Sequence, residues 1–399
     1  MGLNVEKLRG DFPILEKGIT YFDNSCVTLK PKQVVEAINS YYNEFTACAG
    51  RSMHKFGEKT TQQVEISRKK IQKFIGAKKP EEIIFTRNTT EAINLVAKSF
   101  KFEKGNKVLI TDKEHNSNLL PWQLLAEKGV IELEVLDSRD DNTFDMELFK
   151  EKVKGVRLVS IVHTSNLDGV TNPAEKIIKY AHKNGALVLL DAAQSAPHKD
   201  IDMKRLDVDF LAFSGHKMLG PSGIGALYGK KELLEELEPF MVGGETVKDT
   251  TYTDRTWEDL PQRFEAGLQN YAGIIGFAAA AEYLDKVGMK NIMKHEVKLT
   301  EKLTEGIKGV EGLKIIGPEA EERGGITSFY IEGLDPHQIA LMMDKSSGVM
   351  VRSGAHCVHS WFNKHDLEGS VRASLYFYNT EEEVENFIES LKKVLKVLR

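Results

Sequence analysis

Short apolar runs recur through residues 81–228 and predict a series of buried β-strands. Most of these runs are rich in Val, Ile and Leu and contain few polar residues. Such strands are buried on both faces, which is typical of a parallel sheet covered by helices. The predicted strands span residues 81–85, 107–111, 131–136, 156–163, 186–191, 209–214 and 224–228.

Helix-like stretches separate several of these strands, and the pattern changes after about residue 270. Two long helical stretches are then followed by short apolar runs, among them those at 349–354 and 371–377, and by a final helix that begins near Glu381. We therefore predict an α/β protein with a mostly parallel sheet in a large domain, residues 20–270, and a smaller α+β domain, residues 1–19 and 271–399. The other predicted helices span residues 91–100, 118–128, 145–154, 173–184, 271–287, 290–308 and 336–345.

Length and composition agree with a two-domain globular protein. The chain has 399 residues, whereas single cores stop growing at roughly 250–300 residues. Hydrophobic residues make up 41%, charged residues 28%, and the net charge is −5, which argues against general nucleic-acid or membrane-surface binding. No apolar run approaches the ~20 residues that cross a bilayer, and the N-terminus lacks the features of a signal peptide. A cytoplasmic enzyme is the simplest expectation.

Two threonines, Thr89 and Thr90, follow the first predicted strand and open a predicted helix. A helix start offers free N–H groups and the positive end of the dipole, so the two hydroxyls can help to bind a phosphate. A plain N-cap is the alternative for this motif on its own.

An acidic and a basic residue follow two further predicted strands. Asp191 closes one strand, with Gln194 three residues on, and a buried carboxylate needs a cation such as a protonated pyridine nitrogen. A helix N-cap is the alternative for Asp191. Lys217 lies in a Gly-rich turn beside Ser214 and His216. A lysine with a lowered pKa forms Schiff bases, whereas most loop lysines are simply solvated.

Together the three motifs place phosphate ligands, a carboxylate and an amine at strand ends of one predicted sheet. Ligands of such folds bind at the carboxyl ends of the strands. The combination is what a pyridoxal 5′-phosphate (PLP) site requires, namely an anion site, a partner for the pyridine nitrogen and an amine for the aldehyde.

The order of the motifs resembles that of fold-type I PLP enzymes in the class V aminotransferase family, and it is most similar to SufS-type (group II) cysteine desulfurases. The resemblance implies that sulfur is removed from L-cysteine, that L-alanine is released, and that an enzyme persulfide serves iron–sulfur cluster assembly or another delivery. It also implies a homodimer with shared active sites and a protein that accepts the sulfur. The motifs are YFDN at 21–24, TTEAINLVA at 89–97, DAAQS at 191–195, SGHK at 214–217, GPSGIG at 220–225, RFEAG at 263–267, RSGAHC at 352–357 and RASLYFYNTEEEV at 372–384.

The same resemblance implies roles for single residues. Lys217 would carry the cofactor, Asp191 would pair with the pyridine nitrogen, and Gln194 would contact the ring oxygen. His115 would stack on the ring and move protons, and Cys357 would receive the sulfur. The implied phosphate ligands are Thr89, Thr90, Ser214, His216 and, from a partner subunit, Thr256. Arg372 would clamp the substrate carboxylate, with Asn166 near it and near the cofactor, and Arg352 would also bind the substrate.

Cys357 is surrounded in sequence by the basic residues Arg352, His356 and His359, which would favour its reactive thiolate. A metal site that uses Cys357, these two histidines and His365 is an alternative. We predict no metal, because further ligands at the spacing of known zinc sites are missing. A buried, inert thiol is the remaining alternative for this cysteine.

Three positions depart from the resembled pattern and leave the substrate and the sulfur acceptor open. Ala355 stands where the pattern has a histidine, and Ser25 and Cys26 stand where it has two alanines. Cys26 therefore lies near the expected substrate entrance. Because an odd, sparse set of cysteines forms no disulfide framework, we expect Cys26 and Cys48 to be ordinary small hydrophobes, with a second sulfur-handling or redox thiol as the alternative.

Two rival functions stay open at this point. Another class V enzyme, such as an aminotransferase, a selenocysteine lyase, a kynureninase-like hydrolase or an epimerase, would share Lys217 and Asp191. Desulfuration is favoured because a transaminase gains nothing from a thiol such as Cys357 ahead of Arg372. A scaffold without activity is the second rival, and the presence of both the lysine and the aspartate argues against it.

Overall fold

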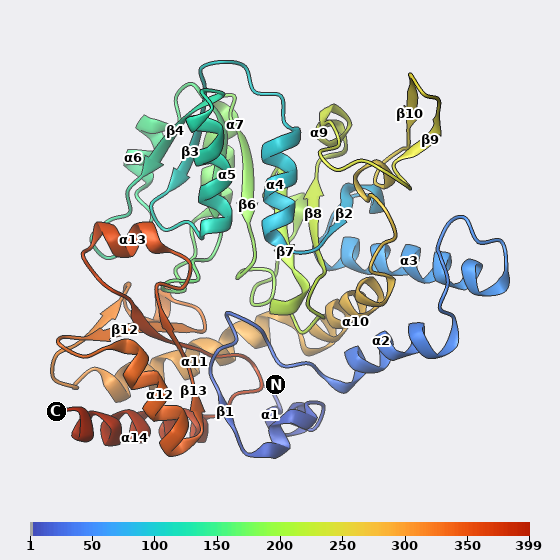
Figure 1. The fold of residues 1–399 in the computed structure, drawn as a ribbon. Coiled ribbons are helices and arrows are strands. Elements are labelled where there is room, and N and C mark those ends of the chain that lie inside the picture. Colours follow the sequence, from blue (N-terminus) through green and yellow to red (C-terminus); the bar gives the residue numbers. More distant parts are fainter. Residues whose placement is uncertain (1–2) are drawn as a thin grey trace.

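The computed structural model describes residues 3–399, so the first two residues of the predicted small domain lie outside the described residues. A seven-stranded sheet forms the centre of the larger part of the molecule (Figure 1). Its order is β2-β8-β7-β6-β5-β3-β4; the strands from β7 to β4 are parallel, and β8 is antiparallel to both of its neighbours. The strands are β2 (Ile83–Thr86), β3 (Asn106–Thr111), β4 (Ile131–Leu136), β5 (Val156–Val162), β6 (Leu187–Asp191), β7 (Phe210–Ser214) and β8 (Gly225–Gly229).

Helices cover both faces of this sheet, as the nearly all-apolar strands predict. Successive side chains of a strand point to opposite faces, so in β6 Val188 and Leu190 join one apolar cluster and Leu189 joins the other. The first cluster includes side chains of α2 (Lys32–Glu44), α3 (Lys55–Phe74), α7 (Ala174–Lys183) and α10 (Tyr271–Val287), and the second those of α4 (Thr89–Ser99) and α5 (Asn116–Glu127). Shorter helices are α1 (Val5–Arg9), α6 (Met146–Lys152), α8 (Met203–Leu206), α9 (Lys231–Glu236) and α13 (His359–Lys364).

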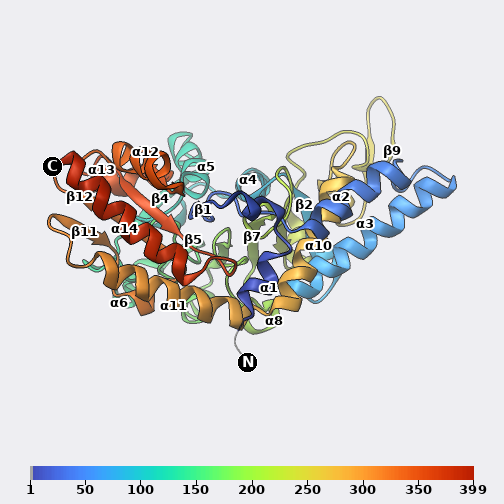
Figure 2. The same cartoon turned by 90° about the horizontal axis from the view of Figure 1, so that it is seen from below.

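A four-stranded antiparallel sheet of order β11-β12-β15-β14 organises the C-terminal part. Its apolar face packs against three helices that lie at one end of the molecule, opposite the end formed by α2 and α3 (Figure 2). The elements are β11 (Leu313–Ile316), β12 (Ile326–Ile331), β14 (Arg352–Gly354), β15 (Ser370–Ser374), α11 (Met289–Ile307), α12 (Pro336–Ser347) and α14 (Glu381–Leu398).

Two small pairs of strands complete the described fold. The run at 349–354 divides into β13 (Val349–Met350), which pairs in parallel with β1 (Thr20–Tyr21), and β14 of the small sheet. An exposed hairpin, β9 (Val247–Thr250) and β10 (Arg255–Trp257), extends from the large part (Figure 1). No helix within residues 3–399 is both long and apolar enough to span a bilayer.

Candidate active site

A cavity of about 270 Å³ lies where the carboxyl ends of the central strands meet the small sheet. Its walls come from the ends of β5, β6 and β7, the starts of α4 and α5, the turn after β1, and the loop after β14. The side chains that line it are Ser25, Cys26, Asn88, Thr89, Thr90, His115, Ser117, Val162, Thr164, Asn166, Asp191, Ala193, Gln194, Ser214, His216, Lys217, Arg352, His356, Cys357 and Arg372.

Asp191 and Lys217 are the charged groups at the strand ends. Asp191 is the last residue of β6, and its Oδ1 accepts a hydrogen bond from the Ala193 backbone N–H at 2.9 Å. Burial raises the pKa of Asp191, while the nearby Lys217 ammonium acts in the opposite direction. Lys217 follows β7 in a short 3-10 turn, and burial lowers its pKa, which favours the neutral, nucleophilic amine.

One end of the cavity carries hydroxyl groups at the start of α4. Asn88 caps this helix, since its Oδ1 accepts from the Glu91 N–H at 3.0 Å. The Thr89 backbone N–H donates to Ser214 Oγ at 2.8 Å, so the helix start is held against the end of β7. Thr90 Oγ1 lies 2.7 Å from Ser117 Oγ at the start of α5. Free N–H groups and hydroxyls at the start of an 11-residue helix form a site suited to a phosphate.

His115 stands at the N-cap of α5, where its Nδ1 accepts from the Ser117 N–H at 3.1 Å. Burial first, and then the positive charge of Lys217, lower the pKa of His115 to about 3. The imidazole is therefore neutral at physiological pH. With Nδ1 used as an acceptor, the proton of the neutral ring resides on Nε2.

A buried carboxyl group supports the His115 turn from behind. Glu114 accepts from Thr111 Oγ1 at 2.6 Å, from the Val162 N–H at 2.9 Å and from Asn118 Nδ2 at 2.7 Å. Burial raises the pKa of Glu114 to about 7 despite these three donors. The contacts join the start of α5 to the ends of β3 and β5, which fixes the position of His115.

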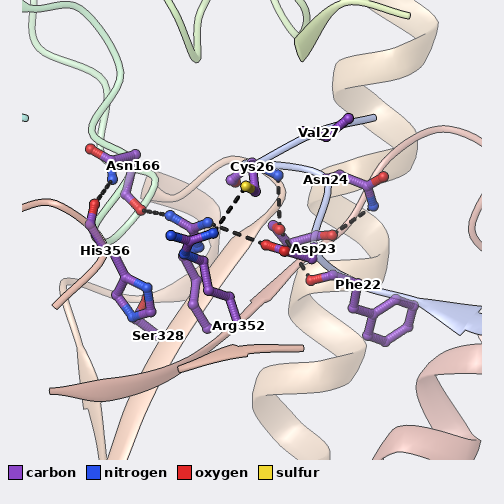
Figure 3. Close-up of polar contacts among 12 residues, drawn as sticks. Phe22, Asp23, Asn24, Cys26, Val27, Asn166, Ser328, Arg352 and His356 are labelled. Atoms are coloured by element: carbon purple, nitrogen blue, oxygen red, sulfur yellow. Dashed lines mark hydrogen bonds and ion pairs between the residues drawn. The ribbon is translucent and has the colours of Figure 1, made fainter. Parts of the chain in front are cut away.

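Two arginines from neighbouring strands of the small sheet enter the other end of the cavity. Arg372, only 2% exposed, donates from Nη1 to the Asn166 carbonyl at 3.0 Å, and its Nη2 lies 3.4 Å from Asp23 Oδ1. Burial lowers the pKa of Arg372 to about 10. Arg352 donates from Nη1 to the sulfur of Cys26 at 2.9 Å (Figure 3). Guanidinium groups are chemically suited to a carboxylate ligand.

Cys357 lies on the loop between β14 and α13, and this loop is tied to the large part of the molecule. The Asn116 N–H donates to the Cys357 carbonyl at 2.7 Å, and Asn166 Nδ2 donates to the His356 carbonyl at 2.8 Å (Figure 3). His356 and Cys357 both have left-handed backbone angles, with φ of 49° and 60°. Such angles are uncommon outside glycine, and consecutive ones make a sharp corner that turns Cys357 toward the cavity.

The structure brings nearly all of the predicted site residues together. The exception is Thr256, which lies in β10 on the exposed hairpin rather than on the cavity wall. Among residues 3–399, no three His, Cys, Asp or Glu side chains are grouped so that they could hold a metal ion. The predicted residues that line the cavity are Thr89, Thr90, His115, Asn166, Asp191, Gln194, Ser214, His216, Lys217, Arg352, Cys357 and Arg372.

Several residues of the site were missed by sequence reasoning. Asn88 carries a signal that was available, because an asparagine before Thr-Thr-Glu is a typical N-cap. Ser117 lies two residues after His115, and Thr164 directly follows the predicted strand 156–163. Neither belongs to a motif that would have marked it as part of the site. Asp23 belongs to the YFDN motif, yet its contact with Arg372 joins residues 349 positions apart and has no local signal.

Buried polar atoms without partners indicate that the cavity accommodates a polar ligand. Gln194 Oε1 and Arg372 Nε are buried and have no hydrogen-bond partner among the described residues, whereas buried polar groups are nearly always satisfied. PLP fits the donor set: Asp191 for the pyridine nitrogen, Gln194 for the ring oxygen, Lys217 for the aldehyde carbon, and the α4 start for the phosphate.

The fold and the cavity together define a class of protein, the fold-type I enzymes whose site lies at the strand ends of a mostly parallel sheet. The chain belongs to the aminotransferase class-V family, whose sequence model matches residues 20–387.

Relatives with assigned names are similar over nearly the whole chain. A cysteine desulfurase of Haloferax volcanii is 38% identical to this chain, and the match covers 98% of this chain and 96% of that protein. A probable cysteine desulfurase of Synechocystis sp. is 42% identical, with 98% and 95% covered. The solved apo structure of a cysteine desulfurase from Thermococcus onnurineus NA1 has a TM-score of 0.95 and 40% identity over 99% of both chains. The predicted fold class is confirmed.

Proposed function

We propose that the protein is a PLP-dependent cysteine desulfurase of the SufS type, which converts L-cysteine to L-alanine and keeps the sulfur as a persulfide on Cys357. The observation that carries the proposal is that Cys357, Lys217 and Arg372 line one cavity, although they come from different parts of the chain. The similarity to named cysteine desulfurases supports the same reaction.

PLP would be held by Lys217, Asp191 and Gln194 around the ring, by His115 on its face, and by the residues at the start of α4 together with Ser214 and His216 around the phosphate. When bound, PLP withdraws electrons from the α-carbon of an amino acid. Asp191 keeps the pyridine nitrogen protonated, because a buried carboxylate is stabilised by an adjacent cation.

The substrate carboxylate would bind to the arginine pair, with Arg372 making the main contact and Arg352 and Asn166 beside it. Arg372 is held by the Asn166 carbonyl and Asp23, so its guanidinium is oriented before the substrate arrives. The Nζ of Lys217, whose burial favours the unprotonated amine, then accepts a proton from the α-carbon. The neutral ring of His115 takes part in proton transfer at the substrate sulfur.

Sulfur transfer would be carried out by the thiolate of Cys357. Its Sγ attacks the sulfur of the bound cysteine, an S–S bond forms, and the C–S bond of the substrate breaks. The carbon skeleton leaves as alanine after it takes up a proton, and Cys357 retains the persulfide. Arg352, at the start of strand β14 just ahead of the Cys357 loop, lines the same cavity.

Two variants test this function against the rivals. Lys217→Ala should lose the visible absorption of bound PLP and all turnover, because no amine remains to hold the aldehyde. Cys357→Ala should keep the yellow colour but form no enzyme persulfide from L-cysteine. Alanine and sulfide are measured with and without a reductant, with the exposed Cys48→Ala as the matched control. Normal desulfuration by Cys357→Ala would remove the thiol from the mechanism.

Selenocysteine is the one alternative substrate that the same geometry favours, because selenium could occupy the place of the substrate sulfur beside Cys357. The ratio of kcat/KM for the two amino acids separates the possibilities. A selenocysteine lyase would prefer selenocysteine by orders of magnitude and would not need Cys357, whereas a desulfurase loses persulfide formation without that residue.

The oligomer and the cellular role complete the proposal. We propose a homodimer in which Thr256 of the hairpin contributes to the phosphate site of the partner subunit, and a protein acceptor that carries sulfur to iron–sulfur cluster assembly or another pathway. All three cysteines are free in the structure, which suits an enzyme that works with thiols in the reducing cytoplasm.

A further inference from the structure

A second thiol, Cys26, lines the same cavity as Cys357. It lies in the turn after β1, and this turn is held firmly: the Cys26 N–H donates to the Asp23 carbonyl at 3.1 Å, and the Tyr21 hydroxyl donates to the Val27 carbonyl at 2.7 Å. Ser374 Oγ accepts from the Ser25 N–H at 2.9 Å. The sulfur of Cys26 is therefore presented to the cavity by a fixed backbone.

The surroundings of Cys26 are not those of an inert core cysteine. Its sulfur accepts a hydrogen bond from Arg352 Nη1 at 2.9 Å, as the dashed line in Figure 3 shows. A guanidinium donor binds a thiolate more strongly than a thiol, because the hydrogen bond is then charge-assisted. Structural cysteines instead pack among apolar side chains.

The two thiols share their neighbours. Arg352 lies in β14, which leads directly into the loop that carries Cys357, while its side chain contacts Cys26. Both sulfurs also act on the pKa of Lys217 in the upward direction, so both lie within electrostatic range of the same Nζ. The Cys357 loop is fixed by contacts with Asn116 and Asn166, which limits how far its sulfur can move to meet an acceptor.

We propose that Cys26 is a second sulfur carrier, which takes the terminal sulfur from the persulfide on Cys357. The Cys26 thiolate attacks the outer sulfur; a new S–S bond forms at Cys26 as the S–S bond at Cys357 breaks, and Cys357 leaves as a thiolate. The transfer needs neither oxidant nor reductant, because one persulfide replaces another. Cys357 is then free for another turnover while Cys26 retains the first sulfur. This inference rests on the proposed desulfurase function.

The test uses the holoenzyme with L-cysteine and no reductant or protein acceptor. Alanine and sulfane sulfur are counted per chain, and alkylated peptides are mapped by mass. The wild-type enzyme should carry sulfur on both cysteines and release a second equivalent of alanine. Cys26→Ser, whose hydroxyl can still accept from Arg352, should stop after the first equivalent. Cys48→Ala, which changes an exposed cysteine away from the cavity, should behave as the wild type.

A further variant tests the order of transfer. Cys357→Ser should leave Cys26 without added sulfur, because Cys26 receives it only from Cys357. Sulfur on Cys26 in that variant, a Cys26–Cys357 disulfide with released hydrosulfide, or wild-type protein with sulfur on Cys357 alone would each overturn the relay. The proposed function is judged separately: alanine formation by the wild type that is lost in Cys357→Ser would leave it intact, whereas no alanine from the wild type would overturn that function as well.

Discussion

Arg372 shows how a single buried side chain depends on partners from distant parts of the chain. Its guanidinium contacts the Asn166 carbonyl and Asp23, and its Nε has no partner among the described residues. A planar group held in this way presents its remaining donors in one direction, which suits a carboxylate.

Replacement of Arg372 by alanine should raise the KM for L-cysteine steeply. Loss of a hydrogen bond to a charged group costs about 1.5–3 kcal/mol, which corresponds to roughly 10- to 100-fold in KM. Arg372→Lys should recover part of the loss, since it keeps the charge without the planar fork. Steady-state kinetics measure the effect, with the exposed Arg205→Ala as a control. An unchanged KM in the alanine variant would exclude Arg372 from carboxylate binding.

Residues at strand ends could be predicted from the sequence, whereas contacts between distant segments could not. Asp191 and Lys217 each follow an apolar run, so their positions at the sheet edge follow from the pattern. The contact between Cys26 and Arg352 joins residues 326 positions apart, and no local periodicity indicates it.

At the scale of elements, the buried strands were predicted well because few polar residues interrupt them. All seven runs of the large sheet are strands in the structure. The run at 349–354 was less informative, because the chain changes partner from β1 to β15 within six residues. The run at 371–377 continues beyond β15, which ends at Ser374, because apolar residues that pack in a core need not belong to a sheet.

The hairpin of β9 and β10 was not predicted, and its residues are mostly exposed in the single chain. It contributes nothing to the cavity of its own chain, which accords with the proposed role of Thr256 in the partner's phosphate site.

Thr256→Ala should weaken the retention of PLP, measured as loss of the visible absorption during dialysis, while Thr253→Ala on the same hairpin should not. Mixing Thr256→Ala with Lys217→Ala should restore activity, because a mixed dimer then contains one complete site. Recovery requires subunit exchange, so the two variants carry different affinity tags and the mixed dimer is isolated by sequential purification on both tags. Absence of recovery in that isolated mixed dimer would contradict the shared site.

At the scale of the whole molecule, three histidines are neutral at physiological pH because they are buried. Burial lowers the pKa values of His163 and His216 to about 4 and that of His115 to about 3.

The domain boundary near residue 270 stays a prediction. Helix α10, which follows this boundary in the sequence, packs on α2 and α3 of the large part.

The buried histidines should make the protein sensitive to acid. Between pH 6.5 and pH 4 the unfolded chain binds more protons at these positions than the folded chain, so stability falls as the pH falls; above pH 6.5 their contribution is complete. Each histidine should cost about 1.4 kcal/mol per pH unit in that range.

Thermal denaturation at pH 7, 6 and 5 measures this dependence. Between pH 7 and pH 5, the melting temperature of His163→Asn should fall less steeply than that of the wild type. At pH 7 itself, the melting temperature of the variant should be lower than that of the wild type, because its packing is altered. The exposed His337→Gln should keep the wild-type slope. Parallel curves for wild type and His163→Asn would show that folding does not lower the pKa of this imidazole.

The sharp corner at His356 and Cys357 also bears on the partner that collects the sulfur. A thiol on a long, mobile loop could move outward and transfer its persulfide sulfur at the protein surface. Here the main chain is held at both residues of the corner, at the His356 carbonyl by Asn166 and at the Cys357 carbonyl by the Asn116 N–H. The sulfur acceptor must therefore enter the cavity to reach Cys357. We expect an acceptor whose nucleophilic thiol lies on a narrow, protruding loop that fits into the cavity. An acceptor whose thiol lies on a broad, flat surface could not reach Cys357.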